Sequence, residues 1–123
     1  MTKIFLTTVV FLSIVASAVS AQDIYATSKD GCDYFVVSET VKHRDLEHRS
    51  DSGKIFRGGE TTGNVKKIRD GKLLEVRSWR FGAFYGHAIV YRIDGVIIGA
   101  FNSPESFYAQ KIMHVMDRCI GRR

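Results

Sequence analysis

The sequence has a single proline, Pro104, and it contains no repeat, low-complexity tract or proline-rich linker after residue 22. Because nothing divides the chain there, residues 22–123 are predicted to form one small domain. The apolar run at residues 4–15 is well short of the ~20 residues that a membrane-spanning helix needs. A transmembrane protein is therefore not predicted.

The first residues instead have the three parts of a secretory signal. Lys3 precedes the apolar run, and small residues follow it up to Ala21. Residues 1–21 are therefore predicted to be a cleaved signal peptide, with cleavage after Ala18 as the alternative. Neither position leaves a cysteine at the new N-terminus, so no lipoprotein anchor is predicted. We expect a protein exported to the periplasm or the extracellular space, without a stable membrane anchor.

Cysteine is scarce, since the chain has only Cys32 and Cys119. Both lie in the predicted exported part, near its two ends, and exported proteins fold where thiols oxidise. They are therefore predicted to form a disulfide that clamps the fold. A redox pair is the alternative interpretation, but the Cys-x-x-Cys spacing that is typical of one is absent.

The excess of positive charge is modest. The chain has 18 basic and 13 acidic residues, and loss of Lys3 with the signal would lower the formal net charge from +5 to +4. This balance permits acidic partners, but the sequence has no dense basic stripe of the kind that nucleic-acid binding requires. We expect a protein or a cell-envelope component as partner, and no nucleic acid.

Hairpin signals dominate the second half of the chain. Asp94-Gly95 and Asp70-Gly71 each separate two strand-like runs. Both faces of the hairpin around Asp94 are largely apolar, which predicts strands near the middle of a sheet. The faces around Asp70 are mixed, which predicts a more peripheral hairpin. Residues 34–37 are predicted to form another strand.

A change to helical periodicity follows at Ser103. This residue can cap a helix that has Pro104 at its first position. Apolar residues then recur three and four apart on one side: Ala109, Ile112, Met113, Met116, Cys119 and Ile120. The predicted fold class is α+β: an antiparallel β-meander of four to six strands with a C-terminal α-helix packed on one face. Residues 42–64 are predicted to be mostly an exposed, charged excursion from the sheet.

No catalytic motif is complete. Serine does not occur in a Gly-x-Ser-x-Gly elbow, and the glycine-rich residues 58–63 lack the Lys-Ser/Thr of a phosphate loop, so they are predicted to be a turn. His43 and His48 are five residues apart, which does not suit a shared metal ion. No metal and no cofactor are predicted. A general acid-base pair of His87 with Glu75 or His43 remains conceivable.

The strongest candidate surface is an aromatic and basic stretch at residues 77–87. Tryptophan beside arginine is typical of protein-binding surfaces. We predict a partner-binding site made by Arg77, Trp79, Arg80, Phe81, Tyr85 and His87. The alternative is that Trp79 and Phe81 belong to the core and that the stem of Arg77 covers their edge.

Two functions are carried forward from the sequence. The first is a small exported, non-enzymatic binding module of the inhibitor, immunity or secretion-accessory type. The second is a small secreted, ribonuclease-like hydrolase that uses His87 or His43 with a carboxylate. An imidazole within about 3–4 Å of a carboxylate or of a second imidazole in a concave pocket would favour the second.

Overall fold

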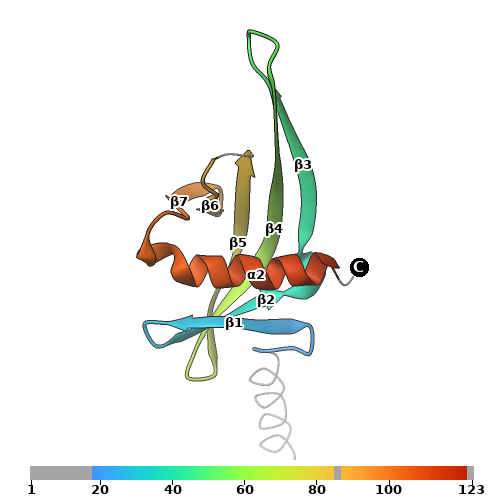
Figure 1. Ribbon diagram of the computed structural model, residues 1–123. Helices are drawn as coiled ribbons and strands as arrows, with labels where there is room; N and C mark the ends of the chain where they lie inside the picture. Colours follow the sequence, from blue (N-terminus) through green and yellow to red (C-terminus); the bar gives the residue numbers. More distant parts are fainter. Residues whose placement is uncertain (1–17, 85–86, 122–123) are drawn as a thin grey trace, which may run out of the picture.

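The computed structural model describes residues 18–84 and 87–121 and confirms an α+β fold, an antiparallel sheet with a C-terminal helix (Figure 1). Most of the predicted signal peptide, and Tyr85 of the predicted partner site, lie outside the described residues. Within the described ranges, no helix is long and apolar enough to cross a membrane. The strands are β1 (Asp23–Lys29), β2 (Cys32–Val37), β3 (Lys42–Arg49), β4 (Ile55–Arg69), β5 (Lys72–Phe84), β6 (Val90–Ile93) and β7 (Val96–Ala100). Two 3₁₀ turns, Ser38–Thr40 and Pro104–Ser106, and the helix α2 (Phe107–Gly121) complete the described fold.

The sheet is built around its longest strand, β4. The strand β5 pairs with β4 along almost its whole length, and the other edge of β4 is shared end to end by β3 and β2. The strand order is β1-β2-β4-β5-β6-β7, with β3 beside the first half of β4. Seven described strands therefore form the sheet, one more than the upper end of the predicted range.

Three Asp-Gly turns connect the hairpins, including one at Asp30-Gly31 that joins β1 to β2. In each turn the aspartate has a φ of 50° to 54° and the glycine a φ of 76° to 83°. Positive φ at both central residues is the signature of the type I′ turn, whose twist suits a two-residue hairpin. The short-range turn chemistry therefore sets three of the strand pairings.

Bulges change the predicted register beyond the turns. A two-residue loop at Asp94-Gly95 pairs Ile93 with Val96, and regular alternation from there would pair Tyr91 with Ile98. A bulge next to Arg92 instead places Tyr91 opposite Gly99. In the other predicted hairpin a bulge after Lys67 likewise shifts the pairing by one residue. The extra residue in one strand moves later side chains to the opposite face, which simple alternation cannot anticipate.

The predicted excursion at residues 42–64 is corrected by the structure. These residues contain β3 and the first half of β4, which pair from Lys42 with Thr62 to Arg49 with Ile55. The predicted glycine turn at residues 58–63 lies inside β4, where a Cβ on Gly58 would overlap the backbone of β5. Glycine here permits a close approach of two strands instead of a reversal of the chain.

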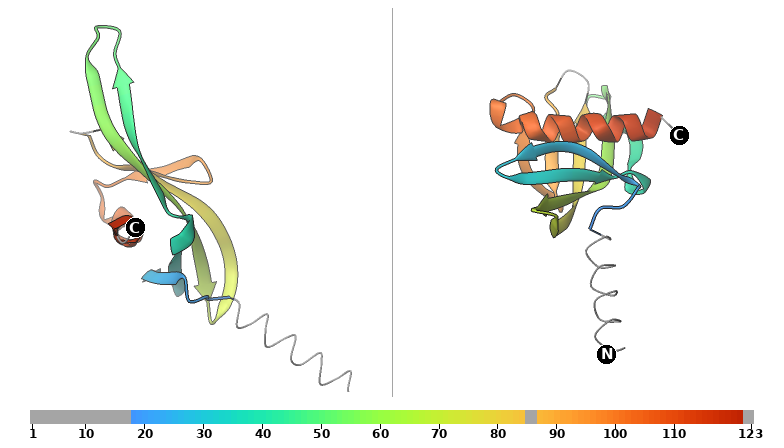
Figure 2. Two further views of the ribbon diagram at one scale, coloured as in Figure 1. Left: turned by 90° about the vertical axis from the view of Figure 1, so that its right-hand side faces the viewer. Right: turned by 90° about the horizontal axis from the view of Figure 1, so that it is seen from below.

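The helix covers the concave side of the sheet. Figure 1 shows α2 crossing the lower half of β4 and β5, and Figure 2 shows it in the hollow of the bent sheet, next to β1 and β2. Its buried residues are Ala109, Ile112, Val115, Met116 and Cys119, most of them on the predicted apolar side. No helix of the described residues covers the opposite, outer face of the sheet or the upper half of the long strands.

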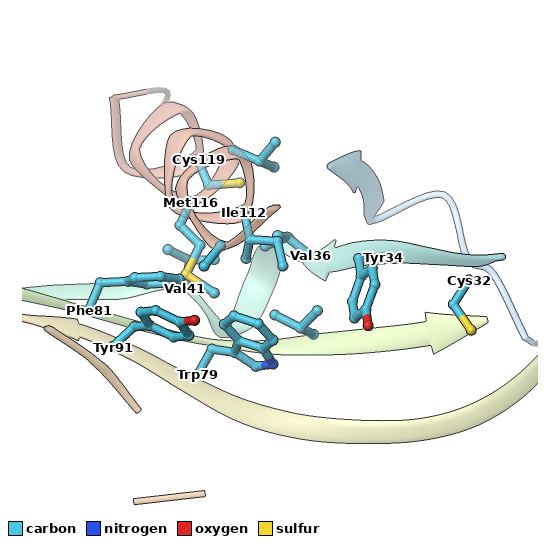
Figure 3. Close-up of a cluster of buried hydrophobic side chains, with 13 residues drawn as sticks. Cys32, Tyr34, Val36, Val41, Trp79, Phe81, Tyr91, Ile112, Met116 and Cys119 are labelled. Carbon is cyan, nitrogen blue, oxygen red and sulfur yellow. The ribbon is translucent and has the colours of Figure 1, made fainter. Parts of the chain in front are cut away.

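The predicted disulfide is also corrected. Cys32 and Cys119 are both free and buried, and Figure 3 shows them at opposite ends of the core. Near Cys32, Tyr34 contacts Tyr108 at the beginning of α2, with ring centroids 5.6 Å apart. Cys119 lies about three helical turns further on, about 16 Å along the axis. A disulfide needs Cα atoms within about 7 Å, so the two thiols cannot pair without a large rearrangement.

Burial of Tyr108 predicts a loss of stability at alkaline pH. Desolvation raises the pKa of Tyr108 from 10 to about 12. Below pH 10 the phenol is neutral in both folded and unfolded chains, and above it the unfolded chain ionises first. The free energy of unfolding should therefore fall as the pH rises from 10 to about 12. Denaturant titrations over this range should show a smaller fall for Tyr108→Phe, and an equal fall would contradict the prediction.

Candidate functional site

A straight row of basic residues crosses the outer face of the sheet. Lys42 on β3 is opposite Thr62 on β4, Thr62 is opposite Arg80 on β5, and Arg80 is opposite Arg92 on β6. Arg44 lies on the same face two residues beyond Lys42, because side chains alternate along a strand. We call Lys42, Arg44, Arg80 and Arg92 the basic row.

A single buried carboxylate, Glu60 on β4, lies beside this row. Its side chain is only 9% exposed, and its Oε1 atom is 2.8 Å from Nε of Arg44 and 3.8 Å from Nε of Arg80. The first contact is a hydrogen bond, while the second is an ion pair too long for one. Glu60 therefore fixes Arg44 firmly and Arg80 only loosely.

The positive charge of the row exceeds what Glu60 neutralises. Arg80 and Arg92 lie directly opposite on neighbouring strands, about 4.8 Å apart, where like charges oppose pairing. Within the described part of the chain, Arg92 makes no ion pair. Four positively charged side chains and one carboxylate therefore share an accessible face of the sheet. The net positive charge of this face attracts negatively charged molecules.

The row borders a hollow of about 450 Å³ on the outer face. Glu60, Arg80, His87 and Arg92 supply its polar lining. Its apolar lining is formed by Leu46, Ala83, Phe84, Ala88 and Val90. Guanidinium groups beside apolar surface match the composition of protein-binding sites, where arginine gives directed hydrogen bonds.

A second hollow, of about 340 Å³, lies near the other side of the same strands. His43, Asp45, Thr61 and His87 line it together with apolar residues that include Met113 of α2. His43 Nδ1 is 3.0 Å from Thr61 Oγ1, and Nε2 is 3.6 Å from Asp45 Oδ1. This meets the distance expected of an acid-base site, although the Asp45 side chain is 97% exposed and water screens the pair.

Gly59 makes the position of the His43 ring possible. A Cβ at residue 59 would lie 2.9 Å from Cε1 of His43, closer than such atoms approach one another. The glycines that suggested a turn therefore make room for an imidazole lying on β4. The structure brings His43 and His87 to the same hollow, as the hydrolase hypothesis requires.

The predicted partner-binding residues are distributed over different parts of the fold. Trp79 and Phe81 are 3% and 2% exposed and lie in the core, so neither offers a surface to a partner (Figure 3). Arg80 and His87 reach the outer hollow. Arg77 binds Glu75 at 2.6 Å and Asp94 at 2.8 Å, which locks the β6–β7 turn to β5.

The remaining candidates do not join either hollow as predicted. Glu75 is engaged by Arg77, and it does not line either hollow, so the proposed His87–Glu75 pair is not formed among the described contacts. His48 stacks near Phe56 and Phe84. No cluster of three potential metal ligands occurs among the residues that the structure describes.

Four members of this site are not identified by the sequence analysis: Lys42, Arg44, Glu60 and Arg92. Arg92 lies in a predicted strand but carries no site signal of its own. The charged composition of residues 42–49 predicts a loop for Lys42 and Arg44, and the glycines around Glu60 predict a turn, whereas the structure places all three residues in strands. The signal that could have found them is the spacing of two between Lys42 and Arg44, which places both on one face of a strand.

The fold and this surface define a class: an antiparallel α+β protein with a C-terminal helix on one face of the sheet and, among the described residues, a basic face on the other side that no helix covers. Comparison of the chain with protein families, with curated proteins and with solved structures found no match.

Proposed function

We propose that this protein is an exported, non-enzymatic module that binds an acidic protein partner through the basic row. The observation that supports the proposal most is the direct apposition of Arg80 and Arg92 on an uncovered sheet face with one nearby carboxylate. An acidic side chain from a partner would relieve the repulsion between the two guanidinium groups. Each charged contact of this kind is stronger than a neutral hydrogen bond.

Apolar surface near the row favours a protein over a simple anion as the partner. Phe84 and Val90 line the same hollow, and the neighbouring strand β7 exposes apolar side chains as well. Interfaces between proteins commonly combine buried apolar contacts with arginine anchors. An anionic envelope polymer would use the charges but gain little from the apolar lining.

Export is the second part of the proposal. Its support is the signal-like pattern of residues 1–21, since the two free thiols no longer contribute to it. We propose that the working form lacks this segment and acts in the periplasm or outside the cell.

Crosslinking in the native compartment tests both parts. Intact mass should show a chain that begins after Ala21 or Ala18, and a full-length mass would contradict export. Arg80→Gln with Arg92→Gln should remove most of the crosslinked partner while the far-ultraviolet circular dichroism spectrum stays unchanged. Loss should approach tenfold or more, because about 1–2 kcal/mol is expected per desolvated charged contact.

A control of equal charge makes this test specific. Lys72→Gln with Lys111→Gln removes two exposed cations that lie outside the basic row. This variant should keep its partner, and an equal loss from both double variants would show that only net charge matters. A captured acidic polysaccharide or nucleic acid, instead of a protein, would also contradict the proposal.

The hydrolase remains a second candidate because one observation favours it: His43 lies 3.6 Å from Asp45 in a hollow that His87 also lines. With Nδ1–H donating to Thr61, His43 Nε2 could take a proton from water as the water attacks the phosphorus of a phosphodiester. His87 would then give a proton to the leaving oxygen as its bond to phosphorus breaks.

A cleavage assay separates the two candidates. If the protein is a hydrolase, it should cut a single-stranded RNA oligonucleotide, and His43→Ala should reduce the rate by about 10²-fold or more. Arg77→Ala, which changes an exposed residue outside both hollows, should leave the rate unchanged. Absence of cleavage by the unmodified protein would eliminate this candidate.

A further inference from the structure

The strand β7 is an open edge of the sheet. It pairs with β6 on one side and with no described strand on the other. Val96, Ile97 and Ile98 are 63%, 62% and 49% exposed, although all three are β-branched apolar residues. An edge of this kind presents backbone donors and acceptors to another extended chain.

The edge lacks the features that normally protect such strands. Residues 96–100 contain no charged residue and no proline, which are the usual barriers to further strand pairing. The opposite edge, β1, differs from β7, because α2 packs against it and the exposed, charged Lys29 stands at its end. The part of β5 that β6 does not reach, residues 72–78, also exposes Leu73, Leu74 and Val76, but charged side chains stand among them. Within the described residues, β7 is therefore the open apolar stretch that no charged side chain protects.

The basic row leads directly to this edge. Ile97 is opposite Arg92, which is itself opposite Arg80. A strand added beside β7 would place a side chain next to Ile97, about 10 Å from the Arg92 backbone. Extended glutamate and arginine side chains can meet over that distance on the shared outer face.

We propose that an extended segment of the partner, alternating acidic and apolar residues, adds to the sheet as a strand beside β7. Its backbone would hydrogen-bond to the free edge of β7, and its acidic side chains would approach Arg92 on the outer face. This inference rests on the proposed function and specifies the partner's form and the edge that receives it.

A second copy of the chain is a poorer occupant than an acidic segment. Residues 96–100 hold no carboxylate, so a copy paired at β7 would bring none opposite Ile97 for Arg92. It would also bring a second basic row to the same extended sheet. Charge complementarity therefore favours a different, acidic chain.

A labelled synthetic peptide of alternating valine and glutamate, about seven residues long, is the probe. Fluorescence anisotropy should show saturable binding to the purified protein. Two further peptides carry N-methyl groups on the odd or the even residues, which removes the amide donors of one edge at a time. One of the two should lose about tenfold or more in affinity, while the other binds normally. A lysine-for-glutamate peptide should not bind.

Variants of the protein locate the contact. Ile97→Gln should weaken binding of the valine-glutamate peptide by about tenfold, because the CH₂ groups of the glutamate beside residue 97 would lose the apolar side chain on which they pack. Ile55→Gln, an exposed residue at the far end of the β3–β4 hairpin, should not change it. Hydrogen exchange should show new protection in residues 96–100 when the peptide is bound.

The outcomes separate this inference from the proposed function. Binding that needs Arg80 and Arg92 but tolerates both N-methylated peptides would overturn strand addition and leave the basic row as the binding site. A different result would overturn the acidic partner and the proposed function together. In that result, one N-methylated peptide loses affinity, but Arg80→Gln with Arg92→Gln does not weaken binding and the lysine-for-glutamate peptide also binds. A dimer of the protein alone that Ile97→Gln dissociates would assign the edge to a second copy and overturn the inference.

Discussion

Replacing Trp79 with alanine is expected to lower the free energy of unfolding by about 3–5 kcal/mol, the range typical of buried aromatic residues. The indole stacks on Tyr91 with ring centroids 6.0 Å apart and planes 7° apart, and Tyr108 meets it edge-on at 5.7 Å. Tyr34 and Phe81 complete the cluster, at 6.4 Å and 5.9 Å. Truncation would leave a cavity among four aromatic rings from four different elements. Urea denaturation followed by circular dichroism would measure the loss.

Two control variants show whether the loss of stability comes from the missing aromatic ring. Trp79→Phe should recover much of the stability because it keeps a ring in the cluster. Arg77→Ala, two residues away on the same strand, should cost far less because that side chain is half exposed. If Trp79→Ala unfolds normally in urea yet loses its crosslinked partner, the indole is a binding residue and its assignment to the core is wrong.

The second large effect is expected at Gly58, where alanine should destabilise the fold by about 1–3 kcal/mol or more. An added Cβ would overlap the carbonyl oxygen of Ala83 and lie 2.6 Å from the Cα atom of Phe84. These neighbours are backbone atoms of the paired strand β5, so they cannot rotate away as a side chain could. The β4–β5 pairing near both hollows would have to separate.

Gly121→Ala is the matched control for this substitution. A Cβ there meets no atom within 4 Å, and the residue ends α2, where alanine is a better helix former than glycine. Its stability should stay within about 0.5 kcal/mol of that of the unmodified protein. Equal stabilities for the Gly58→Ala and Gly121→Ala proteins would show that β4 and β5 do not approach closely at residue 58.

Local patterns succeeded where a few neighbouring residues decide the structure. The Asp94-Gly95 and Asp70-Gly71 pairs predicted two hairpins, and the apolar spacing from Ala109 to Cys119 predicted the inward side of the helix. The first hairpin, at Asp30-Gly31, carries the same signal but was not recognised. Apolar residues around Asp94 suggested central strands, yet β7 is an edge, because an exposed apolar strand and a buried one share the same sequence pattern.

The candidate site was predictable only in fragments. Arg80 and His87 are identified because they stand near aromatic residues in the sequence. Burial could not be inferred for Trp79, since tryptophan beside arginine occurs both in interfaces and at the margins of cores. The predicted disulfide between Cys32 and Cys119 is wrong for a related reason. An oxidising compartment allows two thiols to pair, but it does not decide which end of the helix packs near Cys32, and here that is the beginning of α2.

By itself, the sequence determined the turns, the amphipathic helix and the α+β class, because each depends on backbone preferences and periodicities within a short stretch of chain. Tertiary structure alone decided that Lys42, Thr62, Arg80 and Arg92 stand in one line and that Glu60 is buried beside them. Strand register sets these neighbours, and register depends on bulges and on glycine contacts between segments far apart in the sequence.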